Sequence, residues 1–459
     1  MELLLTLGLL WIIGLLAASL RAQDSTPRSD KSWRYAIAII VLIALVVRLV
    51  PNFLLPVDAS YDIDSFNITA QLLANGQDVY SAPEAVGRHP YLPLQMYWMR
   101  AAQVMSISSG LAFPKVVRLL PIMADALIAG LVFFILQEKN GDRKAWQGAI
   151  FYALNPITVL VTSYHGQFDS IPTLLILLAW MSWKRFSTRG DLFRGGVSAT
   201  LLGLAILIKS WPILFLPVML MNQKDWKVRI SYSLQVTLPS LIAISIYSFQ
   251  FNSDFITILT PVITYNHGIG IWGYTYFIKL GEVFGLYNSE LINWMIGNGR
   301  WITLGIMGIL YWRQPREWSA IKSFLAILQS FFAFTHAFSI QYLSWVIPFA
   351  VIAKQRLPLK RFLLAASAYM IMAYFTLILS FRIAELIPWP LADIALIIQL
   401  GIPAWLIGLH WYVKGLTKKG IDEACSDKVC ILLCNRWFHQ IFSARVRIRK
   451  ESGQHSLNG

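Results

Sequence analysis

Long apolar segments constrain this chain more strongly than any other feature of its sequence. Runs such as LLLTLGLLWIIGLLAASL (3–20) and AIAIIVLIALVV (36–47) are long enough, with their neighbours, to cross the hydrocarbon core of a membrane. Backbone polar groups must be paired inside lipid, and the sequence lacks the alternating pattern of a membrane β-barrel, so we expect α-helices. A chain that is 56% hydrophobic and 14% charged is also not an ordinary soluble domain.

The apolar pattern predicts an all-α polytopic membrane protein with about 11–13 transmembrane helices. The predicted segments are 3–20, 36–55, 119–136, 148–163, 170–183, 196–208, 211–221, 231–250, 295–312, 319–335, 340–353, 361–381 and 391–413. We expect one transmembrane domain over 36–413, preceded by an extra N-terminal helix and a cytoplasmic loop (1–35) and followed by a basic cytoplasmic tail (414–459). The first helix is expected to be retained, because Glu2 replaces the basic start of a signal peptide.

The formal net charge of +15 indicates the orientation of these helices rather than nucleic-acid binding. Most of the 39 Lys and Arg residues fall in alternate loops and in the tail, which is the positive-inside pattern. The basic segments are 21–34, 137–147, 184–195, 222–229, 313–318, 354–361 and the tail after 413. We therefore predict an N-terminus outside the cell, a C-terminus in the cytoplasm and no nucleic-acid partner.

Polar residues gather in the loops of the opposite, outer side. These loops are 56–118, 163–170, 208–212, 260–277 and 334–345. The first of them is too long for a simple connector, and loops of that length are usually functional or disordered. Its composition does not fit disorder. Within it, ITAQLLANGQDVY, closed by Gly76, and QMYWMRAAQVMSI predict two amphipathic helices at the membrane surface.

Five stretches, in order within residues 36–381, resemble one superfamily of membrane enzymes. They are YDIDSFNITAQLLANGQDVY, HPYLPLQMYW, YHGQFDSIPTLLILLAW, LAILIKSWPILFLP and THAFSIQYLSWVIPF. Together they resemble the GT-C glycosyltransferases, polytopic enzymes that use polyprenyl-phosphate sugars. The first two look like the first outer loop of the mannosyltransferases of glycolipid-anchor assembly. HGQFDS is closer to bacterial members and to the lipid-linked-oligosaccharide glucosyltransferases.

The resemblance implies that 36–413 is a GT-C-like catalytic domain that transfers a hexose, with mannose favoured, from a polyprenyl-phosphate donor with inversion. The acceptor is expected to be lipid-linked or part of the cell envelope: a glycolipid, a glycan or a protein. The reaction would occur at the outer face of a bacterial plasma membrane, among membrane lipids. The sequon at Asn67 favours such a source, because a glycan there would obstruct the neighbouring Asp64.

Asp62 is the predicted catalytic base, by its position in YDID. An acceptor hydroxyl is a poor nucleophile, so a carboxylate must take its proton as the new bond forms. Asp64 is predicted to orient the acceptor, to raise the basicity of Asp62, or to hold a divalent cation such as Mg²⁺ or Mn²⁺ together with Asp62. The structural alternative is an acidic helix N-terminus that the helix dipole stabilises.

Lys209 and His336 are the predicted contacts to the donor phosphate. Lys209 interrupts an apolar hairpin, where a lone cation costs roughly 2.5–3.5 kcal/mol unless it is paired or lies at a wet boundary. His336 lies in a loop that, by the resemblance, would sit beside the donor. The structural alternatives are a lysine that extends to the membrane surface and a buried histidine with no ligand.

Further polar residues are predicted to contact hydroxyl groups of the acceptor or the sugar. Three lie in HGQFD, namely His165, Gln167 and Asp169, and the fourth is His267 in YNHGIGIWGY. A capped helix start at Asp169 and a simple glycine turn around His267 are the structural alternatives. Asp125, inside an apolar helix, is expected to give structural support.

A polytopic transporter or lipid flippase is the alternative function, since many helices with intramembrane Asp and Lys would suit one. Transporters usually show internal repeats and charged sites near the middle of the membrane. The sequence shows no repeat, and its polar groups gather on one side. This asymmetry favours an enzyme that works at a membrane surface.

Overall fold

The computed structural model describes residues 32–55, 61–189, 192–221, 223–264, 285, 289–314, 318–336 and 339–353, and the structural statements below concern these residues. The predicted helix 3–20, the predicted helices 361–381 and 391–413, the tail and His267 lie outside them.

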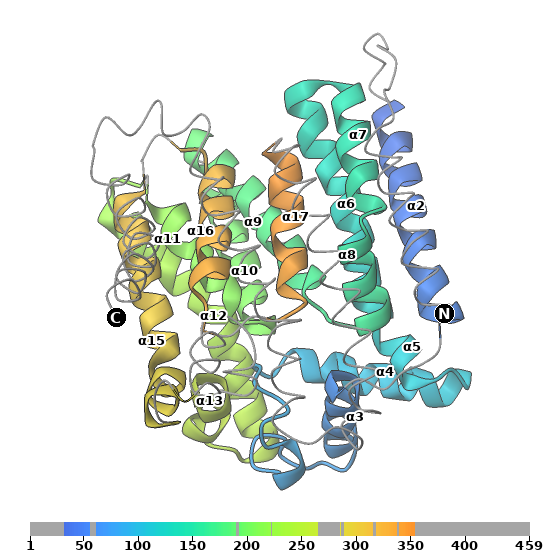
Figure 1. The fold of residues 1–459 in the computed structure, drawn as a ribbon, viewed down its shortest axis with the longest axis vertical. Helices are drawn as coiled ribbons and strands as arrows, with labels where there is room; N and C mark the ends of the chain where they lie inside the picture. Colours follow the sequence, from blue (N-terminus) through green and yellow to red (C-terminus); the bar gives the residue numbers. More distant parts are fainter. Residues whose placement is uncertain are drawn as a thin grey trace, which may run out of the picture. The chain divides into compact units, whose positions relative to one another are not determined.

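Every regular element in the described part of the chain is helical, which confirms the all-α prediction (Figure 1). In chain order the elements are α2 (Ser32–Leu54), α3 (Tyr61–Ala74), η1 (Pro83–Ala85), α4 (Gln95–Ser109), α5 (Phe113–Val117), α6 (Leu119–Asn140), α7 (Asp142–Ala153), α8 (Pro156–Leu160), η2 (Val161–His165), α9 (Ser170–Arg189), α10 (Leu192–Ile208), η3 (Trp211–Phe215), α11 (Leu216–Leu220), α12 (Trp226–Phe251), α13 (Phe255–Thr264), α15 (Ser289–Arg313), α16 (Ala320–Phe334) and α17 (Tyr342–Ile352).

Three of the described helices are long and apolar enough to cross a membrane: Trp33–Leu54, Phe113–Glu138 and Trp226–Phe251. The first and the last of these expose large apolar side chains along their length. Those side chains include Leu42, Val46, Leu234, Leu238, Ile246 and Phe249. Such continuous apolar surface is unfavourable in water and favourable in lipid. The chain is therefore an integral membrane protein, as predicted.

The bundle is built from neighbouring helices that pack in sequence order. The helix α6 contacts α2, α7 and α9, and α10 contacts both α9 and α12. Between α16, α17 and η3 the packing is aromatic: the rings of Trp211 and Trp345 stack 4.2 Å apart, and Phe215 lies 4.4 Å from Phe324. This aromatic packing holds η3 against α17, the helix that carries Trp345.

The long loop 56–118 folds as a layer of short helices, as predicted for its two amphipathic segments. The helix α3 packs on α4, and Gly76, with a φ of +68°, follows the end of α3. Buried residues of this layer share a second apolar core with α12 and α13, to which Phe66, Met96, Tyr247 and Ile258 contribute. Figure 1 shows α3, α4 and α13 at the same end of the bundle.

The predicted helix 148–163 is wrong as a continuous segment. The helix α7 ends at Ala153, and α8 begins at Pro156, with the Asn155 side chain accepting from the backbone N–H of Ile157 at 3.0 Å. An Asn cap followed by proline is a favourable helix start. After α8 the chain widens into the π turn η2, which ends at His165.

A buried ion pair joins α2 to α6. Arg48 and Asp125 are 0% and 1% exposed, and Arg48 Nε donates to Asp125 Oδ2 at 2.6 Å. Tyr152 donates to the other carboxylate oxygen, and Thr162 of η2 donates to Oδ2 at 3.3 Å. These contacts give Asp125 the structural role that the sequence predicts. Asp125 fixes η2, and with it the segment that carries His165, to the bundle.

Candidate active site

The segment HGQFD turns sharply at Gly166, which has a φ of +81°. This left-handed conformation suits glycine, and space requires glycine as well. A Cβ here would lie 2.6 Å from Ile63 Cδ1 of α3 and 2.9 Å from Arg118 Nε. The backbone of Gly166 therefore lies directly against the start of α3. This close approach brings His165 and Gln167 within reach of the α3 carboxylates.

Asp62, in the first turn of α3, is the carboxylate that these side chains contact. Gln167 Nε2 donates to Asp62 Oδ2 at 2.6 Å, and His165 Nε2 lies 3.1 Å from the same oxygen. The Asp62 side chain is 37% exposed, so it keeps access to a ligand while two polar groups hold it in place.

Burial by itself would raise the pKa of Asp62. The hydrogen bond and positive field of His165, the charge of Lys209 and the hydrogen bond from Gln167 outweigh that effect and hold the pKa below its ordinary value of 3.8. Asp62 is consequently ionised at neutral pH.

Lys209 extends the network away from Asp62. Its Nζ donates to Gln167 Oε1 at 3.2 Å and to Asp169 Oδ2 at 2.7 Å. Trp345 Nε1 donates to the second oxygen of Asp169 at 2.7 Å. Lys209 is 7% exposed and Asp169 is fully buried, so the two charges compensate each other inside the protein. The ammonium also lies 4.8 Å from the ring of Phe168.

Five of the predicted site residues thus form one connected network: Asp62, His165, Gln167, Asp169 and Lys209. They come from the first turn of α3, from the end of η2 with the residues after it, and from the residue that follows α10. The bond from Trp345 adds α17. Four of the polar segments that the sequence places on one side of the membrane therefore meet, apart from 260–277, of which the structure describes residues 260–264.

Two other predicted residues lie apart from this network. Asp64 is exposed on α3. His336 follows α16, and its Nδ1 lies 3.4 Å from Thr303 Oγ1. Burial, with a further contribution from the charge of Arg300, lowers the pKa of His336 to about 4. His336 is therefore neutral at pH 7 and can form a hydrogen bond to a phosphate without adding positive charge.

The fit to a divalent cation can be judged from the described residues alone. No group of three or more His, Cys, Asp or Glu side chains among them is arranged to hold a metal ion. Asp62 faces His165, whereas Asp64 is exposed two residues later. Asp62 and Asp64 do not form a metal site by themselves.

Sequence reasoning did not assign roles to several residues that the structure places at or beside the network. Trp345 of α17 donates to Asp169 at 2.7 Å. The ring of Tyr91 lies 5.7 Å from Lys209 Nζ. Arg48 pairs with Asp125, and the signal was present: an Arg in one apolar helix and an Asp in another require partners.

The fold and this network define an integral membrane protein with a carboxylate-centred polar site where helix ends meet. Residues 91–380 match the family model of glycosyltransferase family 87. The match covers more than half of the chain, and the chain belongs to this family. The predicted glycosyltransferase activity is thereby confirmed in preference to transport, in agreement with the resemblance to the GT-C enzymes.

A comparison with solved structures finds similarity to ArnT from Cupriavidus metallidurans, in a crystal structure bound to undecaprenyl phosphate. The two chains are 15% identical, the alignment covers 84% of this chain and 77% of the other, and the TM-score is 0.39. The comparison with curated proteins gives no match.

Proposed function

We propose that the chain is an inverting glycosyltransferase that moves a hexose, with mannose favoured, from a polyprenyl-phosphate donor to a lipid-linked or cell-envelope acceptor at the outer face of the membrane. The observation that supports this proposal best is the geometry around Asp62. An ionised and partly exposed carboxylate is oriented by Gln167 and His165, which is what a catalytic base requires.

In the proposed reaction, Asp62 takes the proton of the acceptor hydroxyl as its oxygen attacks the anomeric carbon. The bond between that carbon and the donor phosphate oxygen breaks, and the lipid phosphate leaves with the bonding electrons. The transition state resembles an oxocarbenium ion, so the negative charge of Asp62 also stabilises it. Gln167 and His165 keep the carboxylate oriented while the proton moves.

The leaving phosphate needs positive charge or hydrogen-bond donors, and Lys209 and His336 remain the proposed contacts. The ion pair with Asp169 gives Lys209 a second proposed role, which is to hold Gln167 against Asp62. Arg88 is a further candidate. Its guanidinium lies 4.6 Å from the ring of Tyr61, the residue before Asp62.

The experiment that tests the base is Asp62→Asn, with purified protein supplied with a panel of polyprenyl-phosphate sugars. Asn is nearly isosteric with Asp but cannot take a proton. We expect turnover to fall by about 10²–10⁴-fold while expression and donor binding persist. Asp64→Asn, on the exposed side of α3, is the matched control and should lose less. A folded Asp62→Asn protein with near-normal transfer would reject Asp62 and leave Asp64 as the candidate base, because Asp169 is fully buried and ion-paired.

A further inference from the structure

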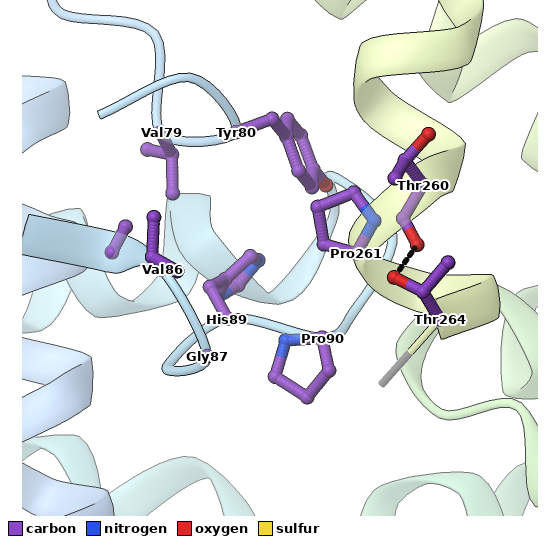
Figure 2. A pocket seen from close by; sticks show the side chains of 10 residues that line it. Val79, Tyr80, Val86, Gly87, His89, Pro90, Thr260, Pro261 and Thr264 are labelled. Atoms are coloured by element: carbon purple, nitrogen blue, oxygen red, sulfur yellow. Dashed lines mark hydrogen bonds between the residues drawn. The ribbon is translucent and has the colours of Figure 1, made fainter. Parts of the chain in front are cut away.

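A cavity of about 450 Å³ lies between the segment 79–90 and α13 (Figure 2). Its wall combines apolar rings and side chains, among them Tyr80, Pro90 and Pro261, with the polar side chains of His89, Thr260 and Thr264. The volume falls within the range of about 300–1,000 Å³ that is typical of small-molecule sites. None of the residues described above as the candidate active site lines it.

His89 is the residue that makes this cavity a candidate binding site. It is 3% exposed, and neither ring nitrogen has a hydrogen-bond partner among the described residues. Figure 2 shows the imidazole on the cavity wall, on the side facing Tyr80 and Pro261. A buried polar group without a partner is costly, and such groups usually bond to a water or a ligand. The cavity is where a partner for His89 can be placed.

The polar groups of the cavity suit hydroxyl groups rather than an anion. Burial lowers the pKa of His89 to about 3, so at neutral pH its ring offers one donor and one acceptor. Thr260 and Thr264 donate to backbone carbonyls of α13 at 2.7 Å each, which leaves their oxygens as acceptors. None of the described residues that line the cavity is charged. A phosphate would therefore find no counter-charge there.

The cavity adjoins the active-site network through one side chain. The rings of His89 and Tyr91 lie 5.6 Å apart, and the ring of Tyr91 lies 5.1 Å from Phe168 and 5.7 Å from Lys209 Nζ. A ligand held against His89 would thus be linked to the network by two successive contacts, from His89 to Tyr91 and from Tyr91 to Lys209. A part of the substrate that is not itself reacting can occupy such a position.

We propose that this cavity binds a neutral sugar unit of the acceptor, with His89 hydrogen-bonded to its hydroxyl groups. The inference rests on the proposed glycosyl transfer and adds an acceptor subsite to it. The lack of charge on the described lining residues places the acceptor there rather than the donor, because the donor sugar is attached to a phosphate.

Binding is tested with methyl α-mannoside, observed by saturation-transfer NMR with the full chain in lipid nanodiscs. His89→Phe removes both nitrogens, and Thr264→Trp fills the cavity from the exposed surface of α13. Both should reduce the signal. Ile263→Trp adds the same bulk at an exposed neighbour that does not line the cavity, and should leave the signal unchanged. His89 is buried, so His89→Phe could disturb folding. Thr264→Trp is therefore the deciding variant for mannoside binding, provided that its melting temperature equals that of the wild type. An unchanged signal in Thr264→Trp would overturn the proposal.

Transfer kinetics separate this inference from the proposed function. In an active preparation, His89→Phe should raise the KM for the acceptor by about two- to tenfold, the loss of one neutral hydrogen bond, with the KM for the donor unchanged. An unchanged acceptor KM, or a raised donor KM instead, would overturn the acceptor subsite and leave glycosyl transfer intact. Mannoside binding without transfer to any acceptor would instead support the cavity and count against the proposed function.

Discussion

Gln167 holds the carboxylate of Asp62 by donating its amide N–H at 2.6 Å, and the other end of the same amide accepts from Lys209 at 3.2 Å. The lysine therefore fixes the orientation of the amide, because only the carbonyl end can accept from an ammonium. Gln167 therefore links the buried Lys209–Asp169 ion pair to the partly exposed carboxylate of Asp62.

The first prediction concerns the pKa of Asp62. Gln167→Leu removes a donor that stabilises the ionised carboxylate, so the pKa of Asp62 should rise. In the wild type Asp62 stays ionised from about pH 5 to 8, and its protonation should not limit kcat/KM there. In the variant the acid limb should move to higher pH. Gln71→Leu, on the exposed side of α3, is the control. If the acid limb of Gln167→Leu coincided with that of the wild type, Gln167 would not be stabilising the ionised Asp62.

The second prediction concerns the ion pair of Lys209 and Asp169. Lys209→Met leaves a buried, uncompensated carboxylate, and we expect it to destabilise the fold by about 3–5 kcal/mol. Replacing both residues, as Lys209→Met with Asp169→Leu, should cost less than the sum of the single changes. Thermal melting in detergent measures the three variants. Strictly additive losses would mean that the pair is not coupled as described.

Donor kinetics with Lys209→Arg separate the two roles proposed for this lysine. Arg keeps the charge but changes the geometry of the bond to Gln167. If Lys209 acts mainly through Gln167, kcat should fall with little change in the KM for the donor. A raised donor KM at unchanged kcat would instead favour direct contact with the phosphate.

The third prediction concerns Gly166. Gly166→Ala places a Cβ in a left-handed conformation and against Ile63 and Arg118, and should cost more than about 1–3 kcal/mol and reduce turnover. Gly110→Ala is a matched control, because Gly110 has a φ of +70° but nothing within 4 Å of its Cβ position. The excess loss in Gly166→Ala measures the close contact with α3. Equal losses in both variants would show that the contact contributes nothing.

The fourth prediction is topological. In a background with Cys425, Cys430 and Cys434 replaced by Ser, a cysteine at Glu84 should react with an impermeant thiol reagent added outside sealed cells. A cysteine at Lys184 should not. Both positions are exposed, so access to the reagent depends only on the side of the membrane. Labelling of the second position alone would place the proposed site in the cytoplasm.

The helices could be predicted because hydropathy is a local property. Each predicted segment between 36 and 353 contains helix, and α4 lies where its amphipathic stretch predicts it. The helix α3 (Tyr61–Ala74) overlaps the stretch 68–80 predicted for it but begins earlier and includes Asp62 and Asp64 in its first turn. The break at Asn155 and Pro156 was missed, although an Asn followed by proline is a local helix-start signal. Apolar composition alone does not reveal where one helix stops and the next begins.

The sequence singled out residues that the structure brings together, but it did not indicate the contacts between them. Asp62, Gln167, Asp169 and Lys209 were chosen as separate contacts to different parts of the substrates. Their pairing depends on how α3, α10 and the segment after η2 pack, which a single sequence does not show. Lys209 was treated as a lone cation because its partner lies 40 residues earlier in the chain. The cost of burying a charge indicates that a partner exists but not which residue it is.

The π turn at Val161–His165 makes the length of this segment a part of the proposed active site. A π turn holds one residue more than an α-helical turn. Deleting one of the residues 161–164 would let α8 continue as an ordinary helix and would rotate everything that follows by about 100° around the helix axis. His165 and Gln167 would then leave Asp62, although neither side chain had been altered. The spacing between Pro156 and Gly166 is therefore as much a determinant of the proposed site as the residues that compose it.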